Sequence, residues 1–217
     1  EIAKLCEAVD ADVKNIRKVI TSDSRIGKQF LYPGPGFGGS CFPKDLRSII
    51  HMAQKLDCNM LIAESAYEIN EKHRKWIGQT IANRLAPKSK VCIWGAAFKA
   101  NTDDIRESIV HDVIADLEKS DCEIIIHDPV ALDNMKEQYG DRLSYAKHHL
   151  RALEACDALI ILTEWTLYRT FDALAASEIM RGKQVFDARN ILARYNLNKH
   201  DFEYWNVGNY GLKESLG

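Results

Sequence analysis

The sequence of 217 residues lacks the apolar run of roughly 20 residues that a helix needs to cross a bilayer. Its first residues also lack a basic segment followed by an apolar stretch and a cleavage site. An excess of one charge is missing too, since 29 Lys and Arg stand against 31 Asp and Glu, a formal net charge of −2. These absences argue against a nucleic acid or a membrane as partner, and they predict a soluble, cytoplasmic protein.

Paired cysteines are also absent, because no two of the six cysteines form a CxxC pair. We therefore expect reduced thiols, most of them in the core, and neither a disulfide framework nor a zinc site. His148 and His149 have no metal-ligand spacing with other His or Cys residues, so we expect both on the surface and predict no metal site. The cysteines are Cys6, Cys41, Cys58, Cys92, Cys122 and Cys156.

The first 86 residues have the apolar spacing of helices, with a recurrence every three or four positions. Because the chain exceeds the usual ~100 to 150 residues of one domain, we predict a helical domain over residues 1–86 and a second domain over 87–217. Pro43 suits the first turn of a helix, and a long helix is expected over residues 61–85, with Gly78 as its weakest helix former. This long helix is expected either in a subunit interface or packed within its own chain.

After residue 86 the pattern changes to short apolar runs bounded by turn residues, with helical stretches at 106–120 and 149–155. Continuous apolar runs are typical of strands that are covered on both faces, as in a parallel sheet flanked by helices. The second unit is therefore predicted to be a Rossmann-like α/β domain. Its strands are expected at residues 90–95, 122–128, 157–163, 183–188 and 202–208.

The stretch "LYPGPGFGGSCFPKD", residues 31–45, contains four glycines and three prolines. Gly34, Gly36 and Gly39 match GxGxxG, but a dinucleotide loop follows a buried strand, whereas this loop lies in a helical region. Proline fixes φ and glycine has no Cβ, so the loop is either a structural turn or a stiff segment whose backbone approaches a ligand closely.

Cys41 lies just before the helix expected near Pro43, where free N–H groups and the helix dipole favour an anion. Lys44 adds positive charge, and these are conditions that favour a nucleophilic thiolate. Asp45 falls in the same first turn. It is expected either to complement the helix N-terminus or to orient and deprotonate water beside the thiol.

The stretch "IWGAAFKANTDDIRES" places Gly95 at a first βα turn, where phosphates bind in nucleotide-binding folds. Alanines replace the later glycines of the dinucleotide fingerprint, and the acidic residue Asp128 comes later than the ~20 residues expected for ribose recognition. We therefore do not expect NAD here in the ordinary mode. Lys99 and Arg106 are either ligands of phosphate or carboxylate groups or solvated cations.

Arg189, in "FDARNIL", follows a predicted strand at the carboxyl edge of the sheet. Ligands of open α/β folds collect at this edge. A structural pair between Arg189 and Asp187 is the competing interpretation.

Three motifs, "GFGGSCFPKD", "WGAAFKANTDDIRES" and "LTEW" followed by "DARNIL", resemble in order and spacing the UDP-glucose/GDP-mannose dehydrogenase family over nearly all of the chain. The resemblance implies a central helical dimerisation domain followed by a Rossmann-like UDP-binding domain, and a homodimer. Family members oxidise a sugar-nucleotide alcohol to the acid in two NAD-dependent hydride transfers. The cysteine loop is most similar to the UDP-glucose branch. The alternatives are that the substrate is GDP-mannose or some other nucleotide sugar, or that the chain is a non-catalytic UDP-sugar-binding or dimerisation module.

The same resemblance assigns roles to single residues. Cys41 is implied to be the nucleophile that forms a thiohemiacetal and then a thioester, and Asp45 to assist the water that releases the acid. Lys44 and Arg106 are implied to contact NAD. Arg25, in "DSRIG", resembles an arginine that family dimers extend into the neighbouring subunit's substrate site. The other residues implied to bind the UDP-sugar are Phe30, Leu31, Tyr32, Pro33, Gly34, Gly38, Phe98, Lys99 and Arg189.

The family places its main NAD-binding domain, and a catalytic lysine and asparagine, ahead of the position of Glu1. The chain begins without Met and already in helical spacing, so it is expected to be a piece of a longer protein. We expect this piece to lack the main NAD site and to be inactive alone.

Overall fold

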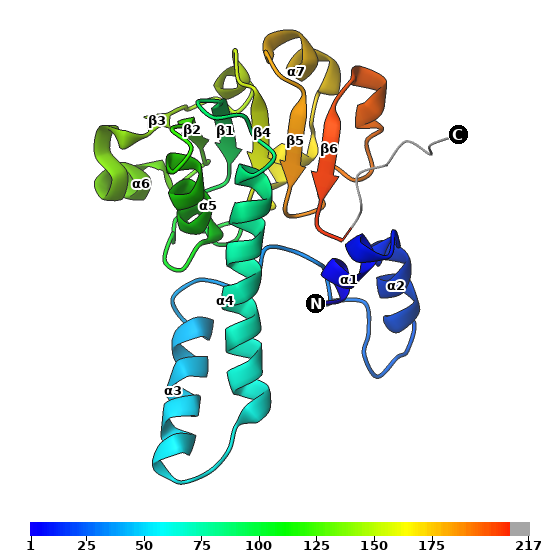
Figure 1. The fold of residues 1–217 in the computed structure, drawn as a ribbon, viewed down its shortest axis with the longest axis vertical. Helices are drawn as coiled ribbons and strands as arrows, with labels where there is room; N and C mark the ends of the chain where they lie inside the picture. Colours follow the sequence, from blue (N-terminus) through cyan, green and yellow to red (C-terminus); the bar gives the residue numbers. More distant parts are fainter. Residues whose placement is uncertain (209–217) are drawn as a thin grey trace.

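The computed structural model describes residues 1–208, so residues 209–217 of the predicted second unit lie outside the described residues. The first part is helical, and from residue 90 strands alternate with helices (Figure 1). The helices expected from the three- and four-residue spacing are present, and the one near Pro43 has this proline in its first turn. The helices of the first part are α1 (Ile2–Ala8), α2 (Val13–Ile20), α3 (Phe42–Lys55) and α4 (Leu61–Ala82).

A parallel sheet of six strands forms the second part, in the order β3-β2-β1-β4-β5-β6. The predicted α/β fold class and the five predicted strands are confirmed. The additional strand β3 has only two residues, too few for a pattern in the sequence. The strands are β1 (Lys90–Trp94), β2 (Glu123–His127), β3 (Ser144–Tyr145), β4 (Ala158–Ile161), β5 (Gln184–Asp187) and β6 (Glu203–Asn206).

Both faces of the sheet are covered by apolar cores. On one face Val91 and Ile93 pack with side chains of α4, α5 (Ile109–Glu118) and α6 (Leu132–Tyr139). On the other face Cys92 and Trp94 pack with side chains that include those of α7 (Ala173–Ile179). Successive side chains of a strand point to opposite faces, so a strand buried on both faces is apolar throughout.

Helix α4 joins the two parts of the molecule. With α3 it forms a hairpin that extends away from the sheet, whereas its C-terminal half packs on α5 (Figure 1). Gly78 was expected as the weak point of this helix, but the helix is unbroken there and the glycine is buried. A Cβ at position 78 would lie 2.5 Å from Asp116 Oδ2 and 3.3 Å from the Asp112 carbonyl oxygen. The missing side chain is therefore what permits the close approach of α4 and α5.

The helices α1 and α2 are attached to the end of β6. Val13 N–H donates to the Gly208 carbonyl at 3.2 Å, and Gly208 N–H donates to Glu7 Oε1 at 2.8 Å. Ala3, Cys6 and Val13 belong to the same apolar core as the sheet face covered by α5. Burial raises the pKa of Glu7, and the hydrogen bond from Gly208 opposes this shift.

Two predicted helices differ from the structure. The helix expected at 106–120 begins only at Ile109, because Ser108 caps it and accepts a hydrogen bond from Val110 N–H at 3.3 Å. The helix expected at 149–155 is wrong, since only a 3₁₀ turn forms at Arg151–Leu153. The apolar spacing there reports burial against the sheet, which a single turn is enough to achieve.

All six cysteines are free thiols. Cys6, Cys92 and Cys156 are buried, Cys122 is half-buried, and Cys41 and Cys58 are exposed, so the core prediction holds for only half of them. His148 is exposed as predicted. The ring of His149, expected on the surface, instead packs 5.2 Å from the ring of Trp94, whose Nε1–H donates to the His149 carbonyl at 3.1 Å. Among residues 1–208, no helix combines the length and the apolar character that crossing a membrane requires.

Candidate active site

The loop of residues 34–39, which leads to Cys41, is held by polar side chains of α4. Asn70 Oδ1 accepts the N–H of Phe37 at 2.8 Å, and Asn70 Nδ2 donates to the carbonyl of the same residue at 3.1 Å. His73 Nε2 donates to the Gly34 carbonyl at 2.8 Å. A Cβ at Gly36 would lie 2.5 Å from Asn70 Oδ1, so this close approach requires a glycine.

The other side of this loop contacts the segment between β1 and α5. Gly39 N–H donates to the Arg106 carbonyl at 2.9 Å, and a Cβ there would lie 2.6 Å from the ring of Phe98. A Cβ at Gly38 would overlap the carbonyl of Glu107. Gly36, Gly38 and Gly39 therefore serve close packing against other parts of the chain, which is the structural alternative, and the approach of this loop to a ligand stays a prediction.

Cys41 is exposed and stands immediately before α3, and its carbonyl accepts the N–H of Asp45 at 2.8 Å. Lys44 Nζ pairs with Asp45 Oδ1 at 3.0 Å. The hydrogen bond with Asp45 raises the pKa of Lys44, and the nearby charge of Cys41 adds a smaller contribution. Cys41 thus lies at a helix start, beside a lysine and a carboxylate.

Arg106 is a second cation close to Cys41. Its Nε pairs with Asp104 Oδ1 at 2.9 Å, while its side chain is 70% exposed. The hydrogen bond with Asp104 raises the pKa of Arg106, and the charge of Cys41 contributes again. Ser40 Oγ lies 3.7 Å from Cys41 Sγ. A hydroxyl group and two cations, each of them paired with a carboxylate, therefore lie near the thiol.

The turn after β1 is occupied by a side chain of the protein itself. Asp128 Oδ2 accepts the N–H groups of Ala96 at 2.8 Å and Ala97 at 3.2 Å. A Cβ at Gly95 would overlap Thr163, and α5 begins only after Ser108. The amides that bind a dinucleotide pyrophosphate in an ordinary Rossmann turn are already used, so NAD does not fit this turn. The structure agrees here with the sequence prediction.

Arg189 stands at the carboxyl edge of the sheet and is largely buried, with 18% of its side chain exposed. Its Nη2 donates to the Phe98 carbonyl and its Nε to the Leu162 carbonyl, both at 2.7 Å. The competing interpretation, a pair with Asp187, applies only to the Arg189 backbone N–H, because the guanidinium pairs with Glu164 at 3.2 Å. Burial lowers the pKa of Arg189, and Glu164 opposes the shift.

All but two of the predicted site residues fall into three places in the structure. Around the turn after β1, Gly34, Gly38, Phe98 and Arg189 meet, and Lys99 Nζ lies 5.3 Å from the centre of the Phe98 ring. Cys41, Lys44, Asp45 and Arg106 form the thiol cluster described above. Leu31, Tyr32, Pro33 and Gly34 line a cavity of about 520 Å³ between α1, α2 and α4.

Two predicted residues lie apart from these groups. Arg25 is exposed and pairs with Asp23 at 2.6 Å, and its role in a neighbouring subunit's site stays a prediction. Phe30 is 78% exposed. Within residues 1–208, no group of three or more His, Cys, Asp or Glu side chains is placed to hold a metal ion.

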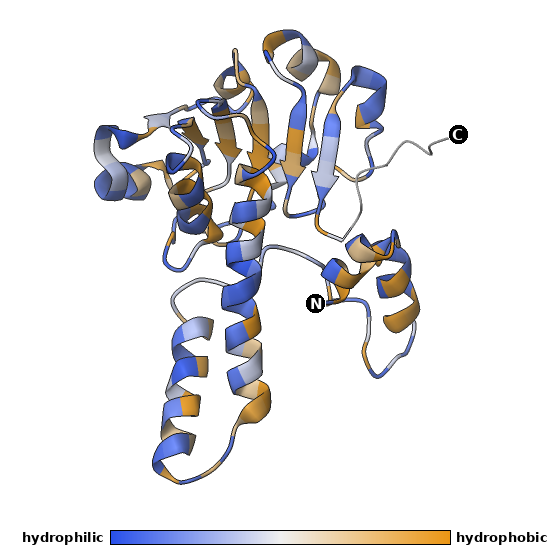
Figure 2. Cartoon of the chain, viewed as in Figure 1, coloured by the Kyte–Doolittle hydropathy of each residue, from blue (hydrophilic) through white to orange (hydrophobic). Residues whose placement is uncertain are grey.

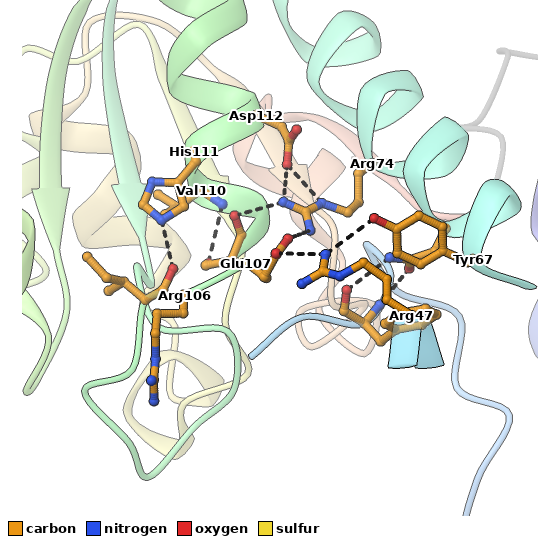
Figure 3. A network of polar contacts seen from close by, with 12 residues as sticks. Arg47, Tyr67, Arg74, Arg106, Glu107, Val110, His111 and Asp112 are labelled. Atoms are coloured by element: carbon orange, nitrogen blue, oxygen red, sulfur yellow. Dashed lines mark hydrogen bonds and ion pairs between the residues drawn. The ribbon is translucent and has the colours of Figure 1, made fainter. Parts of the chain in front are cut away.

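The residues that hold the site together were missed by sequence reasoning. Figure 3 shows Arg47, Arg74, Glu107 and Asp112 in one polar network, with the side chain of Arg106 pointing away from it. Asn70 and Arg74 are polar residues in the middle of a long helix, and both are buried. Their polar run "NEKHR" was the available signal, since buried polar groups need partners.

The matches to known proteins agree with this geometry. A model of the UDP-glucose/GDP-mannose dehydrogenase family, UDP binding domain, matches residues 92–194, and a model of the central domain of this family matches residues 1–72. The chain belongs to this family. The chain is 34% identical over 211 residues to UDP-glucose 6-dehydrogenase of Rhizobium meliloti (strain 1021), a match that covers 96% of this chain and 48% of that protein.

Solved structures of the family share the fold. A UDP-glucose dehydrogenase from the hyperthermophilic archaeon Pyrobaculum islandicum superposes with a TM-score of 0.78 at 31% identity, covering 88% of this chain and 43% of that one. NDP-N-acetyl-D-galactosaminuronic acid dehydrogenase from Methanosarcina mazei Go1 has a TM-score of 0.81 at 22% identity, covering 96% of this chain and 46% of that one, which shows a common fold. The present chain thus spans about half the length of the relatives that it matches.

Proposed function

We propose that this chain is the substrate-binding part of a UDP-glucose 6-dehydrogenase, which oxidises UDP-glucose to UDP-glucuronate. The observation that carries the proposal is the position of Cys41. An exposed thiol stands at a helix start, on a loop whose backbone packs against Phe98, with Arg189 hydrogen-bonded to the same residue. A nucleophile and a cradle for an anionic ligand are thereby held on one rigid framework.

In this proposal Cys41 captures the aldehyde formed by the first oxidation. The thiolate sulfur bonds to the carbonyl carbon, and the carbonyl oxygen takes a proton, which gives a thiohemiacetal. Removal of a hydride from that carbon, and of the proton from its hydroxyl group, leaves a thioester. Water then breaks the C–S bond, which releases the carboxylic acid and the thiol, and Asp45 of the first turn of α3 orients this water.

NAD supplies the hydride acceptor for both oxidations when it is bound to the parent protein. The turn after β1 does not accept it, because Asp128 uses the amides there. We propose that Lys44 and Arg106, both exposed beside Cys41, contact NAD held mainly by another part of the parent protein. Their positive charges suit a pyrophosphate.

The UDP-sugar is proposed to lie along the loop before Cys41. Gly34 leaves the backbone open to close approach, since a Cβ there would have its nearest atom at 3.8 Å, and Gly38 is proposed to extend this surface. Lys99 offers a cation beside the Phe98 ring. Phe30, Leu31, Tyr32 and Pro33 are proposed to complete this surface, and Arg25 to reach the site of a second subunit. The uracil base and the diphosphate are the parts that a UDP-binding domain recognises.

A homodimer through the helical part belongs to the same proposal. Exposed apolar side chains gather at the far end of the α3–α4 hairpin, where Figure 2 shows hydrophobic segments close to the turn. Ile62 is 88% exposed and Leu61 67% exposed. Apolar surface of this kind marks protein–protein contacts. Sedimentation velocity of Ile62→Asp tests this assignment, because the substitution should convert a dimer to a monomer.

Binding of UDP to this chain tests the proposed substrate. We expect calorimetry to detect UDP and UDP-glucose, and Lys99→Ala to weaken the binding of both. Lys136→Ala is a matched control, since Lys136 also lies over an aromatic ring, that of Tyr145 at 5.8 Å. Equal loss in both variants, or tighter binding of GDP-mannose than of UDP-glucose, would contradict the assignment.

Turnover requires the parent protein, of which this chain is proposed to be one part. The full-length protein should form NADH from NAD and UDP-glucose, and Cys41→Ser should abolish steady-state formation of the acid. Unchanged turnover in Cys41→Ser would rule out the covalent route and favour a UDP-sugar-binding module with an idle cysteine. NADH formation by this chain alone would contradict the proposal that another part of the parent protein holds NAD.

A further inference from the structure

The carboxylate of Glu107 lies between two arginines from two different helices. Its Oε1 accepts a hydrogen bond from Arg47 Nη1 of α3 at 3.1 Å, and its Oε2 pairs with Arg74 Nη1 of α4 at 3.5 Å (Figure 3). Arg47 Nη1 also donates to Tyr67 Oη at 3.3 Å. The two helices of the hairpin are thus joined through a residue of the segment between β1 and α5.

Arg74 is the fixed end of this network. Only 8% of its side chain is exposed, and its Nε and Nη2 bond to Asp112 Oδ2 at 2.9 and 2.5 Å. Its Nη2 also donates to the Ser108 carbonyl at 3.3 Å. A buried arginine with this many partners has one arrangement, so it fixes the direction in which Glu107 meets Arg47.

Glu107 also contacts the cysteine loop through its backbone. Its φ of +52° lies in the left-handed region, where a residue other than glycine is held only by its surroundings. Its carbonyl faces Gly38 so closely that a side chain there would overlap it, and the preceding carbonyl accepts Gly39 N–H at 2.9 Å. One residue thus touches the loop before Cys41 and, by its side chain, the helix after it.

Apart from its packing against α4 and the edge-on contact of the Phe42 ring with Phe37, with ring centres 4.6 Å apart, helix α3 has few other attachments. Only Pro43 and Ala53 of its residues are buried. Arg47 stands six residues after Cys41, roughly 9 Å along the helix, so a rotation of α3 about its axis moves both residues together. A half-exposed ion pair contributes little to stability, roughly 0 to 1 kcal/mol, but it selects one orientation of a helix that is otherwise loosely held.

We infer that Glu107 is a positioning residue for Cys41: through Arg47 it sets the rotation of α3, and through its backbone it sets the path of the cysteine loop. The inference rests on the proposed function insofar as Cys41 is the reacting group. Glu107 itself does not touch the substrate in this scheme.

Alkylation of the chain by iodoacetamide, followed residue by residue with mass spectrometry, tests the inference. Cys58, exposed near the opposite end of α3, is the internal reference. In Glu107→Gln we expect the ratio of the Cys41 rate to the Cys58 rate to fall at least about twofold, the smallest change typical of a coupled contact. We expect this fall because a rotation of α3 moves the Cys41 sulfur away from Arg106, whose charge interacts with it.

Glu118→Gln is the matched control, because Glu118 pairs with Arg142 at 2.6 Å on the sheet side of the molecule. This variant should leave the ratio unchanged, and Cys6, Cys92 and Cys156 should stay unreactive in both variants. Arg47→Met should lower the ratio as Glu107→Gln does, and the double variant should add nothing further. Arg47→Met also keeps the test decisive if Glu107→Gln does not fold.

An unchanged or higher ratio in Glu107→Gln or Arg47→Met would overturn the inference. Alkylation of the buried Cys6, Cys92 and Cys156 in these variants would also overturn it, because it would show general unfolding in place of a rotation of α3. Protection of Cys41 by UDP-glucose is measured in the same samples. If UDP-glucose does not slow alkylation in the unmodified chain, the proposed function fails, whereas the ratio measured without ligand still decides the role of Glu107.

Discussion

Asp128 accepts a hydrogen bond from the backbone N–H of Ala96 at 2.8 Å, in the turn where nucleotide-binding folds often hold a phosphate. The same Oδ2 accepts Trp165 Nε1–H at 3.1 Å, and Oδ1 accepts the N–H groups of Val130 and Ala131, both at 3.0 Å. Five donors thus converge on one buried carboxylate. The protein supplies its own anion at this turn.

Asp128→Asn should therefore be strongly destabilising. An amide places an NH₂ group against N–H donors whichever way it turns, so we expect the free energy of unfolding to fall by at least about 3 kcal/mol. Urea denaturation measures this change. Asp133→Asn is the control, because the Asp133 side chain is 97% exposed, and its effect should stay within about 0.5 kcal/mol. A small loss in Asp128→Asn would mean that the turn is not organised by charge.

Asn70→Ala should release the cysteine loop. It removes both hydrogen bonds to Phe37, and we expect a loss of about 2 kcal/mol in the free energy of unfolding. Asn83→Ala, at the exposed C-terminal end of the same helix, should cost little. Equal losses in the two variants would show that helix propensity, rather than the contact with the loop, is being measured.

Gly38→Ala and Gly34→Ala should differ although they lie in one loop. A Cβ at position 38 overlaps the Glu107 carbonyl, whereas one at position 34 finds its nearest atoms at 3.8 and 3.9 Å, ordinary contact distances. Thermal unfolding should thus show a clear loss in Gly38→Ala, by more than about 1 kcal/mol, and little change in Gly34→Ala. The reverse order would contradict the described path of the loop.

His127 should make the protein less stable in mild acid. Burial lowers the pKa of this imidazole from 6.5 to about 4. The unfolded chain therefore binds the proton at a higher pH than the folded one. The stability contributed by the neutral imidazole is present above pH 6.5 and is lost as the pH falls from 6.5 toward 4, by up to about 3 kcal/mol.

His127→Asn isolates this effect, because an amide can replace the hydrogen bond between His127 Nδ1 and Tyr168 Oη, which measures 2.8 Å. Its unfolding free energy in urea should depend less on pH below 6.5 than that of the unmodified chain. The pKa values of His73, His111 and His149 are also lowered by burial, but these residues are common to both proteins. An identical pH dependence would refute the assignment to His127.

The fold was readable from the sequence because burial leaves a period. The continuous apolar runs predicted five strands of a parallel sheet. The spacing of Ile2, Leu5 and Cys6 predicted the first helix, although of these three only Cys6 is buried. The motif around Cys41 located the thiol at the start of α3. Each of these features depends on neighbours in the sequence.

The supports of the site were not readable, because their partners are distant in the chain. Asn70 bonds to a residue 33 positions away, and Arg47 to Glu107 across 60 positions. For Arg189 the nearby Asp187 was the obvious partner, yet the guanidinium pairs with Glu164, which follows the neighbouring strand β4. Periodicity reports which side chains are buried, but it does not say which polar groups meet.

Gly78 is a point at which α4 approaches α5 closely, so a change there would tilt the whole N-terminal half of α4 about this contact, the pivot. At 1.5 Å per residue, Asn70 lies roughly 12 Å from this pivot and Leu61 roughly 25 Å. A tilt of about 10° at the pivot displaces the first by roughly 2 Å and the second by roughly 4 Å. A single methyl group added at position 78, remote from the thiol, would thus displace the cysteine loop by ångströms.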